Sequence, residues 1–153
     1  MSTLSIPRPV YDALRAHGEL TYPGECCGAL LGHVAPPGWH ITAAVPAVNI
    51  RAAAAKTRYE IAPIDLVRIQ REAHAQGLEV AGFYHSHPDC PAQWSPTDLA
   101  EAHWLGCSYV ITEVAQGRAA QTRSFLLTGT TEEDKRFELQ TILIEDESSN
   151  VSR

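Results

Sequence analysis

The chain has 153 residues, of which 44% are hydrophobic and 20% are charged, and its formal net charge is −6. This length and balance predict one soluble globular domain with a sizeable core and exclude an intrinsically disordered chain. The acidic excess and the lack of any Lys/Arg cluster argue against nucleic acid or an anionic membrane surface as the partner.

The first half of the chain opens with a helix signal and continues with strand signals. A helix is predicted over residues 7–17, because two prolines stand near its start, apolar residues share one face, and Gly18 follows as a stop. Apolar runs bounded by turn residues then predict strands. These strands cover residues 25–34, 39–50 and 58–61.

The second half alternates helices with strands. Residues 63–76 predict a helix with proline at its first position, an acidic residue in its first turn and Gly77 at its end. Another helix is predicted over residues 95–105, where it opens on a Ser-Pro pair. Strands are predicted over residues 78–87, 107–114 and 122–129, with a hairpin turn near Gln116 and Gly117. Residues 135–145 suit either a strand or a helix, and we favour a strand.

This order of elements predicts an α/β (mixed α+β) protein with a single mixed β-sheet flanked by helices. We expect the domain to span residues 1–145 and residues 146–153 to form a disordered tail. No apolar run approaches the roughly 20 residues of a membrane span, and the N-terminus lacks the layout of a signal peptide. We therefore expect a cytoplasmic protein without a membrane partner.

The cysteines show no C-x-x-C spacing, and Cys26 and Cys27 are adjacent. This pattern suits neither a disulfide framework nor a cysteine-based zinc finger, so we expect reduced and mostly buried thiols. Cys90 differs from the others because it lies in the loop between two histidines and Ser95. A contact between Cys90 and a metal ion stays an open hypothesis.

The stretch GFYHSHPDCPAQWSPTD, residues 82–98, holds the residues best suited to chemistry. His85 and His87 alternate on a predicted strand, so both imidazoles face the same side at its C-terminal end. Asp98 follows in the first turn of the next predicted helix. Two imidazoles and a carboxylate form a common catalytic zinc set, which leaves the fourth position for water. A second interpretation is that Ser95 and Asp98 only cap the helix.

The same stretch resembles the signature of the JAMM (MPN+) metalloproteases, an isopeptidase family that includes deubiquitinating enzymes. That signature runs His-Ser/Thr-His-Pro, six residues, Ser, two residues, Asp, and every fixed position is filled in residues 85–98. The upstream PGECCG, which contains Glu25, resembles the Pro-x-Glu-x-Cys-Gly of small bacterial members. Trp94 departs from the proline or small residue expected before the serine.

The resemblance implies the JAMM/MPN (cytidine-deaminase-like) fold and a Zn²⁺ ion held by His85, His87 and Asp98. It also implies that Glu25 is the general base and proton shuttle, and that Ser95 helps to stabilise the tetrahedral intermediate. From the residues alone, Glu25 would be a solvated loop charge. By the same resemblance, the enzyme hydrolyses a peptide or isopeptide bond after the Gly-Gly tail of a ubiquitin-like sulfur-carrier protein.

Two other functions compete with this interpretation. A catalytically silent MPN scaffold would bind partners without a metal, but the ligand set and Glu25 are all present. A nucleobase or cytidine deaminase requires H-x-E followed by P-C-x-x-C, and neither motif occurs. The other histidines show no ligand spacing and are expected on the surface or satisfied in the core: His17, His33, His40, His74 and His103.

Overall fold

The computed structural model describes residues 2–51 and 58–146 of the chain. In chain order the elements are β1 (Thr3–Pro7), α1 (Arg8–Thr21), β2 (Cys27–Ala35), β3 (Gly38–Ala47), α2 (Pro63–Ala75), β4 (Glu79–Pro88), α3 (Pro96–Glu101), β5 (Ser108–Ala115), β6 (Arg118–Thr128) and β7 (Arg136–Glu145). Of the predicted tail, only Asp146 is described, and its carboxylate binds the Arg8 guanidinium. Residues 147–153 lie outside the described part. No described helix is both long enough and apolar enough to cross a membrane.

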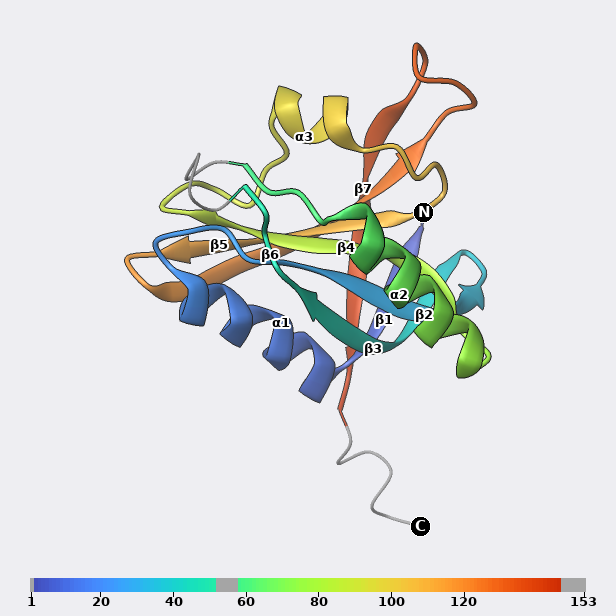
Figure 1. Ribbon diagram of the computed structural model, residues 1–153, viewed down its shortest axis with the longest axis horizontal. Coiled ribbons are helices and arrows are strands. Elements are labelled where there is room, and N and C mark those ends of the chain that lie inside the picture. The colour runs from blue at the N-terminus through green and yellow to red at the C-terminus, as the bar shows by residue number, and fades with distance from the viewer. Residues whose placement is uncertain (1, 52–57, 147–153) are drawn as a thin grey trace.

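The strands form one mixed sheet that closes into a barrel in the order β1-β3-β2-β4-β5-β6-β7. Strand β1 completes the barrel because it pairs in parallel with both β3 and β7. Strands β4 and β5 are also parallel, whereas the other neighbours are antiparallel. Figure 1 shows the strands at the centre with α1 and α2 against them and α3 set apart. The prediction of a single mixed sheet with flanking helices is confirmed, but it did not include closure into a barrel.

Two elements near the N-terminus differ from the prediction. Strand β1 was not predicted, although Leu4 and Ile6 alternate toward the interior and are buried. Helix α1 does not stop at Gly18 but continues to Thr21. A Cβ at Gly18 would come within 3.0 Å of the Val114 side chain, so this glycine allows α1 to approach β5 closely.

Two further predictions were wrong in extent or type. The predicted strand over 58–61 does not form, because only Ile61 makes an isolated β-bridge, with Asn49. Helix α3 ends at Glu101, well before residue 105, since Ala102 adopts an extended backbone. The hairpin turn is confirmed: Gln116 and Gly117 have φ of 51° and 85°, as expected for a tight turn between β5 and β6.

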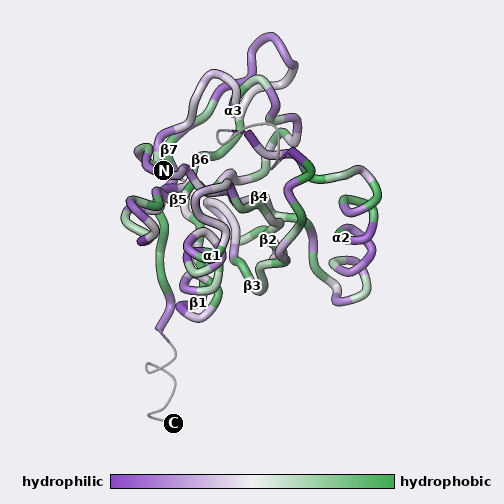
Figure 2. Tube along the Cα trace, turned by 60° about the vertical axis from the view of Figure 1, so that its left-hand side comes forward, coloured by the Kyte–Doolittle hydropathy of each residue, from purple (hydrophilic) through white to green (hydrophobic). Residues whose placement is uncertain are grey.

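The core is divided between the two sides of strands β2 and β4, with α2 and α1 on opposite sides (Figure 2). Phe83 packs in the core that includes Ile69 of α2. The next residue, Tyr84, packs in the core that includes Leu14 of α1. Because side chains alternate along a strand, the histidines that follow Phe83 at every second position turn to the α2 side.

Candidate metal centre

Strand β4 ends at the candidate site and carries its two histidines. On one side, His85 pairs with Cys27 of β2, and on the other, His87 pairs with Glu113 of β5. The Nε2 atoms of the two histidines lie 3.2 Å apart. Their exposed fractions are only 2% for His85 and 9% for His87. The two imidazoles therefore face one shared, water-poor point. Ser86 points away, and its Oγ accepts a hydrogen bond from the Cys26 backbone N–H at 2.9 Å.

Helix α3 brings Asp98 to the same point. Its Oδ1 lies 3.3 Å from His85 Nε2, and its Oδ2 lies 3.2 Å from His87 Nε2. The residue also completes a capping box, because Ser95 Oγ accepts from the Asp98 N–H at 3.1 Å and Asp98 Oδ2 accepts from the Ser95 N–H at 2.9 Å. Asp98 can therefore cap the helix and serve as a metal ligand at the same time. The cap orients the carboxylate toward the histidines.

The spacing of these three side chains suits one tetrahedral cation. Two ligands at a Zn–N distance of about 2.0–2.1 Å stand about 3.3 Å apart in a tetrahedron. The two Nε2 atoms lie 3.2 Å apart, and each lies 3.2–3.3 Å from a different oxygen of the Asp98 carboxylate, so the carboxylate faces both rings. Within residues 2–51 and 58–146, this is the single group of three or more His, Cys, Asp or Glu side chains that could hold a metal ion. The residues therefore fit a bound metal.

Burial and mutual attraction set the protonation of the three groups. Burial raises the pKa of Asp98, but the hydrogen bonds to His85 and His87 outweigh burial and hold that pKa far below its usual range. Burial lowers the pKa of His85, which favours the neutral ring that a metal requires. Burial also acts against the charged form of His87, but the hydrogen bonds to Asp98 and to the Pro91 carbonyl raise its pKa. A cation would replace the proton that this cluster shares.

Groups around the ligands orient the two rings. His87 Nδ1 lies 2.9 Å from the Pro91 carbonyl oxygen. Since that oxygen can only accept, Nδ1 carries the hydrogen and Nε2 is left free for a metal. The ring of Tyr59 stacks on His85, with centroids 4.4 Å apart and an interplanar angle of 23°. The sequence did not identify either partner, because neither a backbone carbonyl nor a distant tyrosine belongs to a local motif.

Glu25 is buried, so the interpretation of a solvated loop charge is wrong. Its exposed fraction is 2%. It lies two residues before Cys27, which pairs with His85, and it is close enough to His87 for the two charges to interact. Burial raises the pKa of Glu25 to about 8, while the charge of His87 lowers it and that of Asp98 raises it. Its Oε1 has no hydrogen-bond partner within the described residues. Such a carboxyl group can exchange a proton near neutral pH.

The remaining candidates take different positions. Ser95 Oγ accepts the cap hydrogen bond, which leaves its own hydroxyl hydrogen available to donate. Cys90 is exposed and does not belong to the group of three ligands. Other histidines have their own neighbours: His17 with Tyr84, His33 with His40, His40 with Glu145, and His103 with Glu132.

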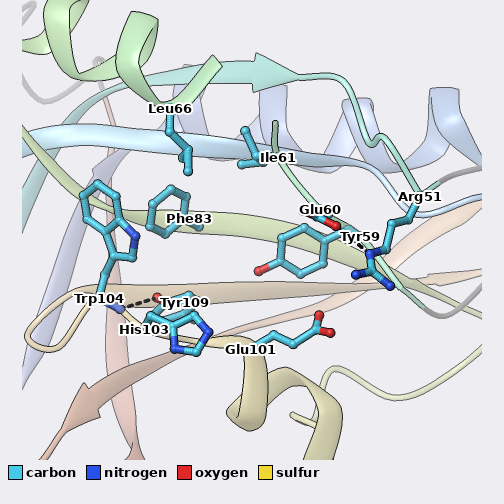
Figure 3. A pocket seen from close by; sticks show the side chains of 10 residues that line it. All are labelled: Arg51, Tyr59, Glu60, Ile61, Leu66, Phe83, Glu101, His103, Trp104 and Tyr109. Atoms are coloured by element: carbon cyan, nitrogen blue, oxygen red, sulfur yellow. Dashed lines mark hydrogen bonds and ion pairs between the residues drawn. The ribbon is translucent and has the colours of Figure 1, made fainter. Parts of the chain in front are cut away.

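A pocket of about 330 Å³ adjoins the metal centre. Its lining combines aromatic and apolar side chains with a few charged ones: Arg51, Tyr59, Glu60, Ile61, Leu66, Phe83, Glu101, His103, Trp104 and Tyr109. Figure 3 shows the Tyr59 hydroxyl turned toward the middle of this group. Because Tyr59 also stacks on His85, the pocket and the metal centre share a wall. Sequence reasoning missed the pocket, since its residues come from separate segments.

Comparison with protein families and curated proteins gives three matches. The profile of a family described as prokaryotic homologs of the JAB domain matches residues 7–128. A protein named desampylase from Haloferax volcanii is 34% identical over 114 residues, which cover 72% of this chain and 80% of that protein. A protein named probable TtuB-protein conjugate cleaving protease from Thermus thermophilus is 31% identical over 101 residues, which cover 66% of this chain and 64% of that protein.

Among the solved structures that resemble this chain are two that cover most of its length. A protein from Desulfitobacterium hafniense superposes with a TM-score of 0.80 at 21% identity and covers 94% of both chains. A protein from Salinibacter ruber superposes with a TM-score of 0.69 at 36% identity, covering 96% of this chain and 93% of its own. At 21% identity, the first likeness supports the fold alone.

Proposed function

Because this chain belongs to the prokaryotic homologs of the JAB domain, we propose that it is a zinc-dependent isopeptidase that cleaves conjugates of a ubiquitin-like protein. The family predicted from the His-Ser-His-Pro and Ser-Pro-Thr-Asp motifs is confirmed by this membership. Two similar proteins are named for the cleavage of protein conjugates, as a desampylase and as a probable TtuB-protein conjugate cleaving protease. We extend that activity to this chain.

The observation that carries the proposal is the convergence of His85, His87 and Asp98, with 3.2 Å between the two Nε2 atoms and 3.2–3.3 Å from each of them to a carboxylate oxygen, which supports a shared cation. We assign these three side chains as the zinc ligands. A zinc ion held there would supply a Lewis acid for the scissile carbonyl and a water of lowered pKa, near about 7. A scaffold without catalysis would not need this ligand set beside a buried glutamate.

We assign Glu25 as the general base and Ser95 as a hydrogen-bond donor to the developing oxyanion. Glu25 accepts a proton from the attacking water and passes it to the leaving amine, while the new C–O bond forms and the C–N bond breaks. The positive charge of a zinc ion held by the three ligands would lower the pKa of Glu25 from its buried value, which would make the carboxylate available at neutral pH. A well-placed acid/base of this kind contributes roughly 10²–10⁴-fold to the rate.

We propose that the substrate is a sulfur-carrier-type ubiquitin-like protein with a Gly-Gly C-terminus, acting in the cytoplasm. Glycine could approach the Tyr59 ring and the ligand set closely because it has no side chain. The pocket next to Tyr59 offers apolar surface for the residues that precede the glycines. The four free thiols are compatible with a reducing compartment. The mixed sheet flanked by α1 and α2 supports assignment to the cytidine-deaminase-like fold.

The test uses zinc-loaded protein and a target protein joined through an isopeptide bond to a sulfur-carrier protein. We expect release of the carrier, its loss on chelation and its return with added zinc. Glu25→Gln should keep the zinc and lose about 10²–10⁴-fold in rate. Glu133→Gln, at an exposed site in the turn between β6 and β7, is the matched control and should be as active as wild type. Zinc-loaded wild-type protein that releases nothing would exclude this substrate class.

A further inference from the structure

Asn49, two residues beyond the end of β3, uses every hydrogen-bonding group of its side-chain amide. Its Nδ2 donates to the Glu25 carbonyl oxygen at 3.2 Å and to the Arg58 carbonyl oxygen at 3.0 Å. Its Oδ1 accepts from the Arg51 N–H at 2.9 Å and from the Glu60 N–H at 3.0 Å. One side chain thus connects four points of the backbone around the candidate site.

The first of these points is the peptide group that follows Glu25. Its carbonyl oxygen accepts from Asn49, and its N–H, which belongs to Cys26, donates to Ser86 Oγ at 2.9 Å. This peptide is therefore hydrogen-bonded through both its carbonyl oxygen and its N–H. Ser86 lies between the two histidines in the sequence of β4. The Glu25 Oε1 has no partner of its own in the described part of the chain. The direction of the Glu25 side chain consequently depends on this fixed backbone.

Two other points flank Tyr59. Asn49 binds the carbonyl of Arg58 and the N–H of Glu60, the residues on either side of Tyr59. Holding both neighbours places the Tyr59 ring in its stack on His85, 4.4 Å between centroids. The same side chain thus constrains the base on one side of the site and the ring that covers a ligand on the other.

A local turn would account for only part of this arrangement. An asparagine that accepts from the N–H two residues later forms a common Asx turn, which explains the bond to Arg51. The other bonds reach residues 9, 11 and 24 positions away along the chain. A turn does not require them.

We propose that Asn49 is a positioning residue of the hydrolytic site. Its hydrogen bonds fix the backbone of Glu25 relative to the segment that carries Tyr59. The role of Asn49 rests on the proposed function, because it assumes that Glu25 is the base. Asn49 contacts none of the three ligands directly, so it should affect turnover rather than metal content.

Kinetics of two variants test this role. Asn49→Ala removes all four bonds, whereas Asn49→Asp keeps the acceptor and removes the two donated bonds. Both should keep zinc and a nearly unchanged KM, while kcat falls about 100-fold, the cost of a misplacement on the order of 1 Å. Gln70→Glu, an exposed amide-to-carboxylate change on α2, is the matched control and should keep wild-type kcat. A wild-type kcat in Asn49→Ala, or loss of zinc in either variant, would overturn the proposal.

Amide hydrogen exchange tests the same geometry without a substrate. In Asn49→Ala, the Arg51 and Glu60 amides, whose N–H groups donate to Asn49 Oδ1, should exchange about tenfold faster, as expected for the loss of one hydrogen bond. In Asn49→Asp, the Arg51 and Glu60 amides should exchange as in wild type, since the carboxylate keeps an acceptor for both. If zinc-loaded wild-type protein cleaves no conjugate, the proposed function fails. Amide hydrogen exchange then tests by itself whether Asn49 fixes these backbone segments. Unchanged exchange at both amides in Asn49→Ala would refute it.

Discussion

The buried carboxyl of Glu25 makes a quantitative prediction about stability in the metal-free protein. Burial raises its pKa to about 8, against 4.5 for an unperturbed glutamate. Between these two pH values the folded chain keeps a proton that the unfolded chain has lost. The free energy of unfolding therefore falls as pH rises through this window, because the folded state binds more protons. Below about pH 4.5 both states are protonated and the effect disappears.

The magnitude follows from the width of the window. At pH 7 the unfolded carboxyl is about 2.5 pH units above its pKa, and each unit corresponds to about 1.4 kcal/mol. Titration of this carboxyl should thus make the free energy of unfolding of wild type about 3 kcal/mol lower at pH 7 than at pH 4.5. Glu25→Gln removes this titration while it keeps the shape of the side chain. The variant should become progressively more stable than wild type as pH rises.

The assay is denaturant unfolding in the presence of a chelator at several pH values from 4.5 to 8, followed by tryptophan fluorescence. Other titrating groups are present in both proteins, so the difference between the two curves reports mainly on Glu25 and on its attraction to His87. Glu133→Gln, an exposed change of the same kind, should show the same pH dependence of the free energy of unfolding as wild type. A stability difference between Glu25→Gln and wild type that is constant over this range would refute the reasoning.

Three further predictions concern neighbouring positions. Gly28→Ala should lower the free energy of unfolding by about 1–3 kcal/mol, measured by urea titration, because the new Cβ would stand 2.3 Å from the Tyr84 ring; wild-type stability would show that this contact relaxes freely. Tyr59→Ala should reduce kcat/KM while zinc content stays unchanged, since the ring covers His85 without binding the metal; an unaltered kcat/KM would exclude a role for the stack. Cys90→Ser should leave the zinc content measured by mass spectrometry as it is, because Cys90 lies outside the ligand group; a loss of zinc would make Cys90 a ligand.

The ligand set could be predicted from sequence because its signals are local. His85 and His87 stand two residues apart on one strand, and Asp98 lies in the first turn of the following helix. Strand alternation and helix capping act over a few residues, so they are readable without the fold. The same holds for the turn at Gln116 and Gly117.

Features that depend on distant segments could not be predicted in this way. Closure of the barrel requires β1, a strand of five residues, to pair with β3 and β7. The burial of Glu25 depends on the strand pairing of β2 with β4, and from the residues alone a glutamate after Pro-Gly reads as exposed. Gly18 was interpreted as a helix stop, whereas its role is a close contact with Val114. Asn49 and Tyr59 carry no motif, and only the folded chain shows their partners.

Zinc binding by metal-free protein, measured by titration calorimetry, tests the central claim most directly. The two imidazoles and the Asp98 carboxylate predict one tight site per chain in wild type, and Asp98→Asn should abolish it because the amide cannot replace the anionic ligand. Wild-type protein that takes up no zinc, or an Asp98→Asn variant that binds it as tightly as wild type, would contradict the shared cation on which the proposed hydrolysis depends.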